Sequence, residues 1–385
     1  MNPSFPAWTQ EKTRVAIVHD WVTGMRGGEA ILDAICELFP QADLFTLLQT
    51  DFKMSANILN RRTVHTSYLQ KLMRFPRLQK EYRKLLPLFP HAISSLDLSS
   101  YDLILSNTHC VAKGVRKKPG ALHVAYVSTP MRYVWDMFED YFGPGKSGAL
   151  TSLVARAIRK PLQNWDVKST ESVDVIMANS TFVQRRIQDF WQRESTVVHP
   201  FVDIERFPLR DTKASDYYLI VSAMAPYKRI DLAVESFTRL KLPLKIIGKG
   251  QDEYKLRKMA RGQNIEFLGG LSNEALGEFY RKARAFVFPG LEDFGITPLE
   301  AMCSGRPVIA YGKGGLLDTV TEKTGIFFSE QTVESLMAAV VKMEKLYPQF
   351  SAESCHTRAE EFTRKKFIAE YSNVLARALE KKSKL

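Results

Sequence analysis

Short apolar runs rich in β-branched residues alternate with longer helical patterns along almost the whole chain. Such alternation is typical of parallel sheets covered by helices, because parallel strands are joined by helical crossovers. The pattern therefore predicts an α/β protein. The predicted strands are residues 14–21, 42–48, 101–107, 121–128, 173–180 and 195–200, then 217–223, 242–248, 265–270, 283–290, 306–311 and 324–329.

The pattern restarts after a polar, proline-containing stretch, "HPFVDIERFPLRDTKASD" at residues 199–216. A chain of 385 residues is long enough for two domains with separate cores. We therefore predict two doubly wound domains facing a cleft, at residues 1–208 and 209–385. The charged final stretch, residues 358–385, is predicted to be one long helix, which could pack back on the first domain.

Composition and charge narrow the classes of partner. The net charge of +12 favours phosphorylated ligands or anionic lipid. No nucleic-acid-binding motif accompanies the charge, so nucleic acid is not expected as a partner. The N-terminal stretch has no apolar signal-peptide core, no apolar run is long enough to span a membrane, and the four cysteines show no metal-ligand spacing. These features are typical of a reduced cytosolic protein.

The stretch "LEDFGITPLEAMCSG" at residues 291–305 runs from a predicted strand into a predicted helix. Thr297 is the expected N-cap and Pro298 the expected first helical residue. Ligands of parallel sheets commonly bind at such turns, and a helix N-terminus suits a phosphate. Glu292 and Glu300 flank the turn. Thr297 and Glu300 also fit a capping box, in which Glu300 would only hold its own helix start.

Three other loops at predicted strand ends carry groups suited to ligand binding. Gly27 and Gly28 allow close backbone approach at a helix start. Lys228 and Arg229 follow the first strand of the second half and could hold a diphosphate. His109 ends another predicted strand. The alternatives are a tight connection for the glycines, a solvated loop for the cations and a structural role for the histidine.

Residues 61–84 contain eight Lys/Arg and one acid, with apolar residues at roughly helical spacing. A basic amphipathic segment can lie on an anionic membrane surface. The alternative is a helix packed on its domain with a solvated basic face.

Several of these stretches resemble one known family. "EDFGITPLEAMCSGRPVIAYGKGG" resembles the Glu-x7-Glu region of retaining glycosyltransferases of family 4, and "PYKRIDLAVESF" and "ANSTFVQRRI" are similar to other blocks of that family. "GGEA", "SNTHCVAKGV" and "YVSTPMRYVWD" resemble its bacterial O-antigen and exopolysaccharide mannosyltransferase branch. The resemblance implies the GT-B fold, with two Rossmann-like domains.

The resemblance also implies roles for individual residues. Glu292 matches the glutamate near the donor-sugar hydroxyls, and Glu300 matches the glutamate that holds the nucleotide ribose. Lys228 matches the diphosphate-binding lysine, and His109 matches the histidine near the donor sugar. The remaining nucleotide-binding residues expected are Gly27, Gly28, Arg229, Phe294, Gly295, Ile296 and Thr297. Many relatives carry a diphosphate-binding arginine where Ala223 stands here, so Arg229 is expected to assist Lys228.

The leading interpretation is a retaining α-mannosyltransferase that uses GDP-mannose and a lipid-linked saccharide acceptor at the inner face of the cell membrane. No cofactor is expected. Because no Asp-x-Asp occurs, metal-independent transfer is also expected. One alternative donor is a UDP-sugar. A different class of alternative is a catalytically idle sugar-nucleotide-binding partner in an assembly complex.

Overall fold

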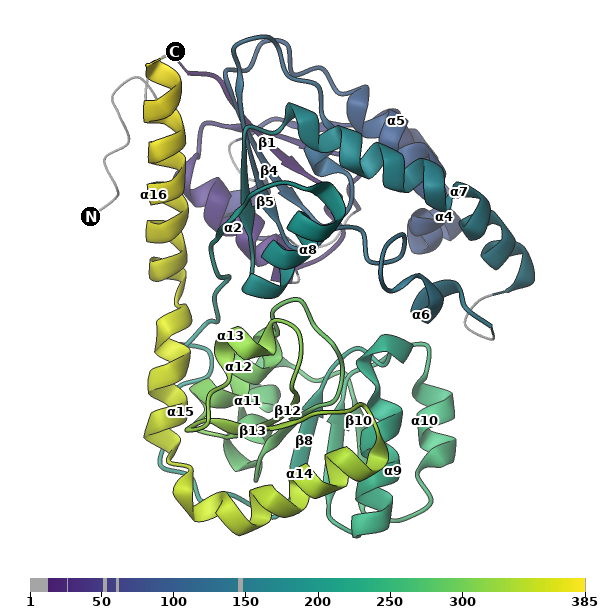
Figure 1. Cartoon of the computed structure of the whole chain (residues 1–385), viewed down its shortest axis with the longest axis vertical. Coiled ribbons are helices and arrows are strands. Elements are labelled where there is room, and N and C mark those ends of the chain that lie inside the picture. Colours follow the sequence, from purple (N-terminus) through teal and green to yellow (C-terminus); the bar gives the residue numbers. More distant parts are fainter. Residues whose placement is uncertain (1–12, 26, 51–53, 60–61, 145–147, 385) are drawn as a thin grey trace. The chain divides into compact units, whose positions relative to one another are not determined.

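The computed structural model describes residues 13–25, 27–50, 54–59, 62–144 and 148–384 (Figure 1). The chain divides into two compact units. Unit 1 comprises Met1–His199 and Phe367–Leu385, and unit 2 comprises Pro200–Lys366. Each unit is an α/β domain with its own parallel sheet. Among the described residues, no helix combines the length and the hydrophobicity needed to cross a membrane.

Unit 1 is built on a seven-stranded parallel sheet of order β3-β2-β1-β4-β5-β6-β7. The strands β1 and β4 at its centre are fully buried, which explains their continuous apolar runs. The strands are β1 (Val15–His19), β2 (Asp43–Thr46), β3 (Val64–Thr66), β4 (Leu103–Thr108), β5 (Leu122–Val127), β6 (Val175–Ala178) and β7 (Thr196–Val197).

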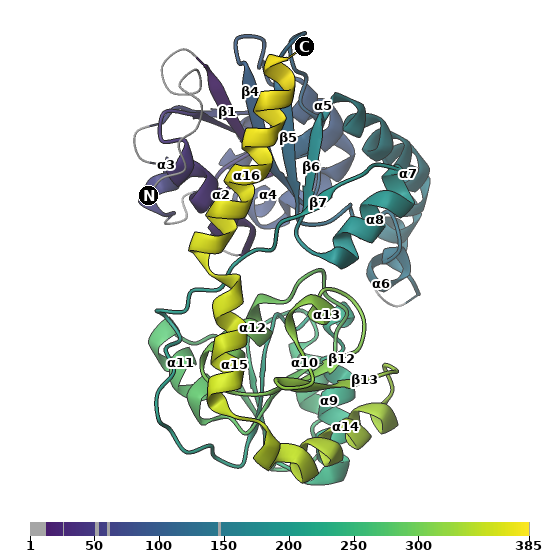
Figure 2. The ribbon, with the colours of Figure 1, turned by 60° about the vertical axis from the view of Figure 1, so that its left-hand side comes forward.

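Helices lie on both faces of this sheet, and Figure 2 shows α16 crossing one of them. On that face Tyr126 of β5 packs against Phe367 and Tyr371 of α16. The helices are α2 (Gly27–Leu38), α3 (Ala56–Leu59), α4 (Pro76–Glu81), α5 (Phe89–Ser94), α6 (Phe138–Phe142), α7 (Ala149–Lys168), α8 (Thr181–Trp191) and α16 (Arg364–Ser383), with 3₁₀ helices η1 (Tyr68–Arg74), η2 (Tyr82–Leu88), η3 (Ala112–Gly114) and η4 (Ser169–Ser172).

Unit 2 is built on a six-stranded parallel sheet of order β10-β9-β8-β11-β12-β13. Its strands are β8 (Tyr218–Val221), β9 (Leu244–Ile247), β10 (Ile265–Gly269), β11 (Phe286–Phe288), β12 (Val308–Tyr311) and β13 (Gly325–Phe328). Its helices are α9 (Ile230–Leu240), α10 (Glu253–Met259), α11 (Asn273–Lys282), α12 (Ile296–Cys303), α13 (Leu316–Thr319), α14 (Val333–Leu346) and α15 (Ala352–Ala359), with η5 (Pro226–Lys228), η6 (Tyr347–Gln349) and η7 (Glu360–Phe362).

Alternate residues of the unit 2 strands enter two separate cores, as the period of two in a strand requires. Val287 packs with α9 and α14 on one face, whereas Phe286 and Phe288 pack with α11, α12 and α15 on the other. Both faces of the sheet are therefore covered, as predicted for a doubly wound domain.

The division between the units differs from the predicted boundary at residues 208/209. It lies at residues 199/200, because Val202 N already donates to Phe362 O and Phe207 is buried in a core of unit 2. Residues 367–385 belong to unit 1 rather than to the second domain.

The single long helix predicted over residues 358–385 is wrong. The segment is broken into the end of α15, the short η7 and α16. Thr363, between η7 and α16, forms an isolated parallel β-bridge with Val202, and this pairing takes the backbone out of helical geometry.

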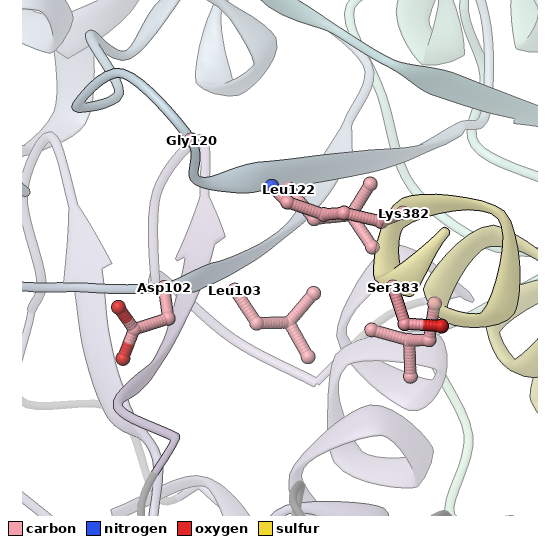
Figure 3. Close-up of a pocket in the computed structure, with 7 residues that line it drawn as sticks. Asp102, Leu103, Gly120, Leu122, Lys382 and Ser383 are labelled. Atoms are coloured by element: carbon pink, nitrogen blue, oxygen red, sulfur yellow. The ribbon is translucent and has the colours of Figure 1, made fainter. Parts of the chain in front are cut away.

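A pocket of about 280 Å³ opens at the amino ends of β4 and β5, beside the last turn of α16. Figure 3 shows Lys382 and Ser383 of α16 near Leu103 and Leu122, the first residues of these strands. It lies at the opposite edge of the sheet from the strand ends described next.

Candidate active site

The strand order of unit 2 reverses between β8 and β11. The chain runs from β8 outwards to β9 and β10, and then returns to β11 on the other side of β8. Ligands of open α/β sheets bind outside the carboxyl ends of the strands at such a switch point. The loops that leave β8 and β11 carry Lys228 and Glu292, so the topology brings these two predicted residues together.

Lys228 and Glu292 form an ion pair in which the Lys228 Nζ donates to Glu292 Oε2. Only 13% of the lysine side chain and 14% of the glutamate side chain are exposed. The Nζ also lies 5.3 Å from the centre of the Phe288 ring, at the end of β11. The pair is therefore largely shielded from water and balanced in charge.

Gly290 explains how the two loops approach so closely. A Cβ at this position would lie 2.9 Å from Lys228 Cα and 3.1 Å from Tyr227 O. Any side chain would push the backbone of η5 away, so a residue without a Cβ is required.

The turn between β11 and α12 differs from the predicted cap. Gly295, with φ of +91°, is the N-cap, and Ile296 and Thr297 are the first two helical residues. Pro298 is therefore the third helical residue and lacks an N–H. A Cβ on Gly295 would lie 2.8 Å from Leu316 Cδ1, in addition to the strain of the left-handed backbone.

This arrangement leaves the amides of Ile296 and Thr297 at the helix start, where no intrahelical acceptor exists. They are suited to bind an anion. Phe294 is different, because its side chain is buried and contacts Phe362 in the core. Gly305 follows the C-cap of this helix with φ of +76°.

Glu300 does not make the capping box that the sequence allows, since the helix start has no side-chain cap. Instead, Tyr280 of α11 donates its hydroxyl to Glu300 Oε2 at 2.7 Å. Burial raises the pKa of Glu300 above its ordinary value, although the Tyr280 hydrogen bond and Arg206 oppose this shift. The carboxylate is thus held in place by a neighbouring helix.

Arg229 adopts a left-handed backbone with φ of +51° at the N-cap of α9. Its Nε lies 3.3 Å from Asp231 Oδ1 in an ion pair. The guanidinium follows Lys228 directly but is already paired, so it would have to be shared to assist with a diphosphate.

Unit 1 has a corresponding switch point between β1 and β4, because β2 and β3 lie on one side of β1 and β4 on the other. Asp20 follows β1 directly, and His109 follows β4 directly. His109 Nδ1 lies 3.1 Å from Asp20 Oδ2, and the Trp21 ring contacts the His109 ring edge to face with centres 4.6 Å apart.

Asp20 is fully buried and organises the whole turn after β4. Its carboxylate accepts backbone N–H bonds from His109, Cys110, Val111 and Ala112 at 2.6–3.0 Å. Burial alone would raise the pKa of Asp20, but His109, His19 and these amides lower it overall. The ionised carboxylate can only accept hydrogen bonds, so Nδ1 of His109 carries a proton and donates it to Asp20 Oδ2.

Gly27 and Gly28 are the first two residues of α2. The Asn107 side chain at the end of β4 donates to Gly28 O at 2.8 Å, which fixes the helix start beside the switch point. A Cβ on Gly28 would lie 3.8 Å from the ring of His19, which is ordinary contact. Both glycines therefore lie at the same sheet edge as His109.

Two residues of these sites were not predicted. Asp20 could have been, since it directly follows the first predicted strand and the carboxyl ends of neighbouring parallel strands meet at one edge. Tyr280 could not, because nothing in its sequence spacing relates α11 to Glu300.

Comparison with known proteins gives a matching family model and several relatives. Residues 201–362 match the family model "Glycosyl transferases group 1". The chain is 28% identical over 246 residues to the O-antigen chain mannosyltransferase C of Escherichia coli, with 58% of this chain and 65% of that protein covered. It is 28% identical over 201 residues to a GDP-mannose-dependent phosphatidylinositol monomannoside mannosyltransferase of Corynebacterium glutamicum, with 44% and 53% covered. The chain thus spans less than two thirds of the length of these curated relatives.

The fold resembles that of Anabaena HepE, whose structure was solved in complex with UDP-glucose. The TM-score is 0.65 at 15% sequence identity, with 94% of this chain and 99% of that chain covered. Identity this low supports the fold alone, and the fold is GT-B, as the resemblance implied. The match to the family model "Glycosyl transferases group 1" covers nearly the whole of unit 2 and less than half of the chain.

Proposed function

We propose that this chain is a retaining glycosyltransferase that transfers mannose from GDP-mannose to a lipid-linked saccharide during the synthesis of a cell-surface polysaccharide. The observation that carries the proposal is the arrangement at the unit 2 switch point. There the Lys228–Glu292 pair, the amide donors that begin α12 and the buried Glu300 lie on neighbouring loops and helices of one sheet edge.

Each of these groups matches one part of a nucleotide sugar. Lys228 would bind the diphosphate, and the amides of Ile296 and Thr297 would stabilise the negative charge that develops on it as the sugar leaves. Glu300, oriented by Tyr280, would accept hydrogen bonds from the ribose hydroxyls. Glu292 would accept hydrogen bonds from the sugar once the diphosphate engages Lys228.

Transfer breaks the bond between the anomeric carbon and the diphosphate oxygen and forms a bond from that carbon to the acceptor oxygen. Retention through a covalent intermediate needs a carboxylate nucleophile at the anomeric carbon. Glu300 is assigned here to the ribose and Glu292 to the sugar hydroxyls, so we favour displacement on one face of the sugar. The leaving diphosphate then takes the acceptor proton, and His109, fixed by Asp20, positions the sugar.

The choice of mannose and of GDP rests on the relatives, since the E. coli and C. glutamicum proteins are mannosyltransferases by name. A UDP-sugar donor is the nearest alternative, because HepE was crystallised with UDP-glucose. The lipid-linked acceptor is also proposed by analogy with these relatives. The protein would bind such an acceptor at the inner membrane surface.

The test is calorimetric titration with GDP, UDP and ADP, followed by transfer assays with the matching sugar nucleotides. We expect GDP to bind most tightly and Lys228→Met to weaken its binding by roughly tenfold or more, because a charge-assisted contact is lost. The control is Lys255→Met, an exposed lysine on α10. Tighter binding of UDP than of GDP would mean that the donor is a UDP-sugar. Nucleotide binding without any sugar transfer would favour the alternative of a catalytically idle binding partner.

A further inference from the structure

Helix α7 has an apolar face that the fold leaves uncovered. Among the described residues, eleven large apolar side chains are exposed, and four of them lie on this one helix. Leu150 is 74% exposed, Leu153 66% and Val154 45%. Together with the exposed Ala157 they recur at the spacing of one helical face.

A different face of α7 holds the helix on unit 1. Leu162 is buried in the unit 1 core, and Ile158 and Trp165 pack against that core. The buried Asp166 accepts hydrogen bonds from the indole N–H groups of Trp135 and Trp191 and pairs with the buried Lys113. The exposed apolar face is therefore additional to the packed one, and folding of unit 1 does not account for it.

The basic segment identified in the sequence does not offer a comparable face. Leu69, Met73 and Tyr82 are buried, and most other apolar residues of this segment pack on the same core. Five cations of this segment are nevertheless exposed: Lys71, Arg74, Arg77, Arg83 and Lys84. The segment packs on unit 1 through the short helices η1, α4 and η2, so it supplies charge and α7 supplies apolar surface.

The exposed charges on the elements around the unit 1 core are mostly positive. The elements η1, α4, η2, α6 and α7 carry two exposed acids, Glu139 and Asp140, among their described side chains. The same elements expose eight cations: Lys71, Arg74, Arg77, Arg83, Lys84, Arg156, Lys160 and Lys168. An apolar helix face accompanied by an excess of Lys and Arg is the composition that binds the interface of an anionic bilayer.

We propose that the α7 face formed by Leu150, Leu153, Val154 and Ala157 inserts into the interfacial layer of an anionic lipid bilayer, with the basic residues of α7 and of residues 68–88 contacting the headgroups. The proposal specifies the membrane contact of the proposed function and rests on it. Long Lys and Arg side chains can reach the headgroups while their stems cover apolar surface.

The first experiment is vesicle flotation of the full chain with the triple variant Leu150→Ser, Leu153→Ser, Val154→Ser. The vesicles contain equal parts of phosphatidylglycerol and phosphatidylcholine. We expect at least about a tenfold loss of vesicle affinity, because three aliphatic side chains lose their apolar contact. The matched control changes two exposed apolar residues of unit 2, Tyr254→Ser and Val341→Ser, and should bind vesicles normally.

The second experiment places a reporter on the face. All four native cysteines are buried, so Leu153→Cys provides an accessible thiol for an environment-sensitive dye. Emission should shift to the blue on these vesicles, while dye at Val341→Cys should not respond. Unchanged flotation of the triple variant, or an unresponsive dye on bound protein, would overturn the proposal.

Two further readouts distinguish membrane insertion from self-association and from damage to the nucleotide site. If the triple variant converts a dimer into a monomer in sedimentation velocity and still binds vesicles, the face is an interface between copies and the proposal is wrong. Nucleotide titration without vesicles should be the same for the triple variant and the wild type. Loss of vesicle binding with intact GDP binding supports the inference, whereas a wild-type chain that binds no nucleotide refutes the proposed function independently.

Discussion

The ion pair between Lys228 and Glu292 leads to a prediction whose sign is unusual. If a diphosphate binds Lys228, it must compete with a carboxylate that already holds the ammonium group. Replacing Glu292 with Gln removes this competitor while preserving the size of the side chain. We therefore expect Glu292→Gln to bind GDP more tightly than the wild type, and to transfer sugar more slowly because a sugar contact is weakened.

The magnitude follows from the burial of the pair. Both side chains are less than 15% exposed, so screening by water is limited. A charge-assisted hydrogen bond contributes about 1.5–3 kcal/mol, and the neutral amide retains about 0.5–1.5 kcal/mol. The net loss is about 1–2 kcal/mol. The free energy of unfolding should fall by that amount without ligand, and GDP affinity should rise roughly fivefold to thirtyfold.

Calorimetric titration of GDP measures the affinity, and urea unfolding without nucleotide measures the stability. Glu322→Gln serves as the control, because it removes the same charge from an exposed position of unit 2. Weaker GDP binding by Glu292→Gln would refute the reasoning, since it would mean that the carboxylate helps the nucleotide bind instead of competing with it.

Three other predictions concern the remaining groups. Asp20→Asn should destabilise unit 1 by about 1.5–3 kcal/mol or more, since it removes the buried charged acceptor of four backbone N–H bonds. It should also move the acid limb of the pH–rate profile, and an unchanged profile would exclude a role for Asp20 in holding His109. At pH values above the raised pKa of Glu300, Glu300→Gln should weaken GDP binding about tenfold to a hundredfold. The difference from the wild type should shrink as the pH falls through that pKa, because the wild-type carboxyl then loses its charge too. Because the pKa of Glu300 is raised in the folded state, Glu300 stabilises that state at low pH, and this contribution is lost as the pH rises through the raised pKa. Comparing the free energies of unfolding of the wild type and Glu300→Gln across the acid range would reveal it. Transfer should survive EDTA, and complete loss restored by manganese would contradict metal independence.

The strands were largely predictable because buried parallel strands are continuous apolar runs. β3 was not, because Val64–Thr66 is short, only half-buried and located at the sheet edge, where pairing with β2 holds it. The break at Thr363 was equally hidden, since its cause is a residue more than 150 positions earlier, Val202. The local spacing of apolar residues predicts helices and strands, but it carries no information on backbone pairing between residues so far apart in the sequence.

For the candidate site, sequence indicated the residues but not their partners. Lys228 and Glu292 were expected as separate ligand contacts, and the structure joins them as a pair. Thr297 was expected to cap α12, yet Gly295 takes that position because its left-handed backbone turns the chain into the helix. Side-chain pairing depends on which strands are neighbours, and strand order cannot be read from periodicity.

The assignment of the last helix to unit 1 has a consequence for synthesis on the ribosome. Residues 1–199 emerge first, but the helix that carries Phe367 and Tyr371 against Tyr126 is made last. Unit 2, by contrast, is continuous in sequence, and its ends are joined by the Val202–Thr363 bridge. We expect unit 2 to complete its fold while one face of the unit 1 sheet is still uncovered and accessible to chaperones. A stop codon before residue 364 should therefore leave a chain whose second unit is protease-resistant and whose first is degraded.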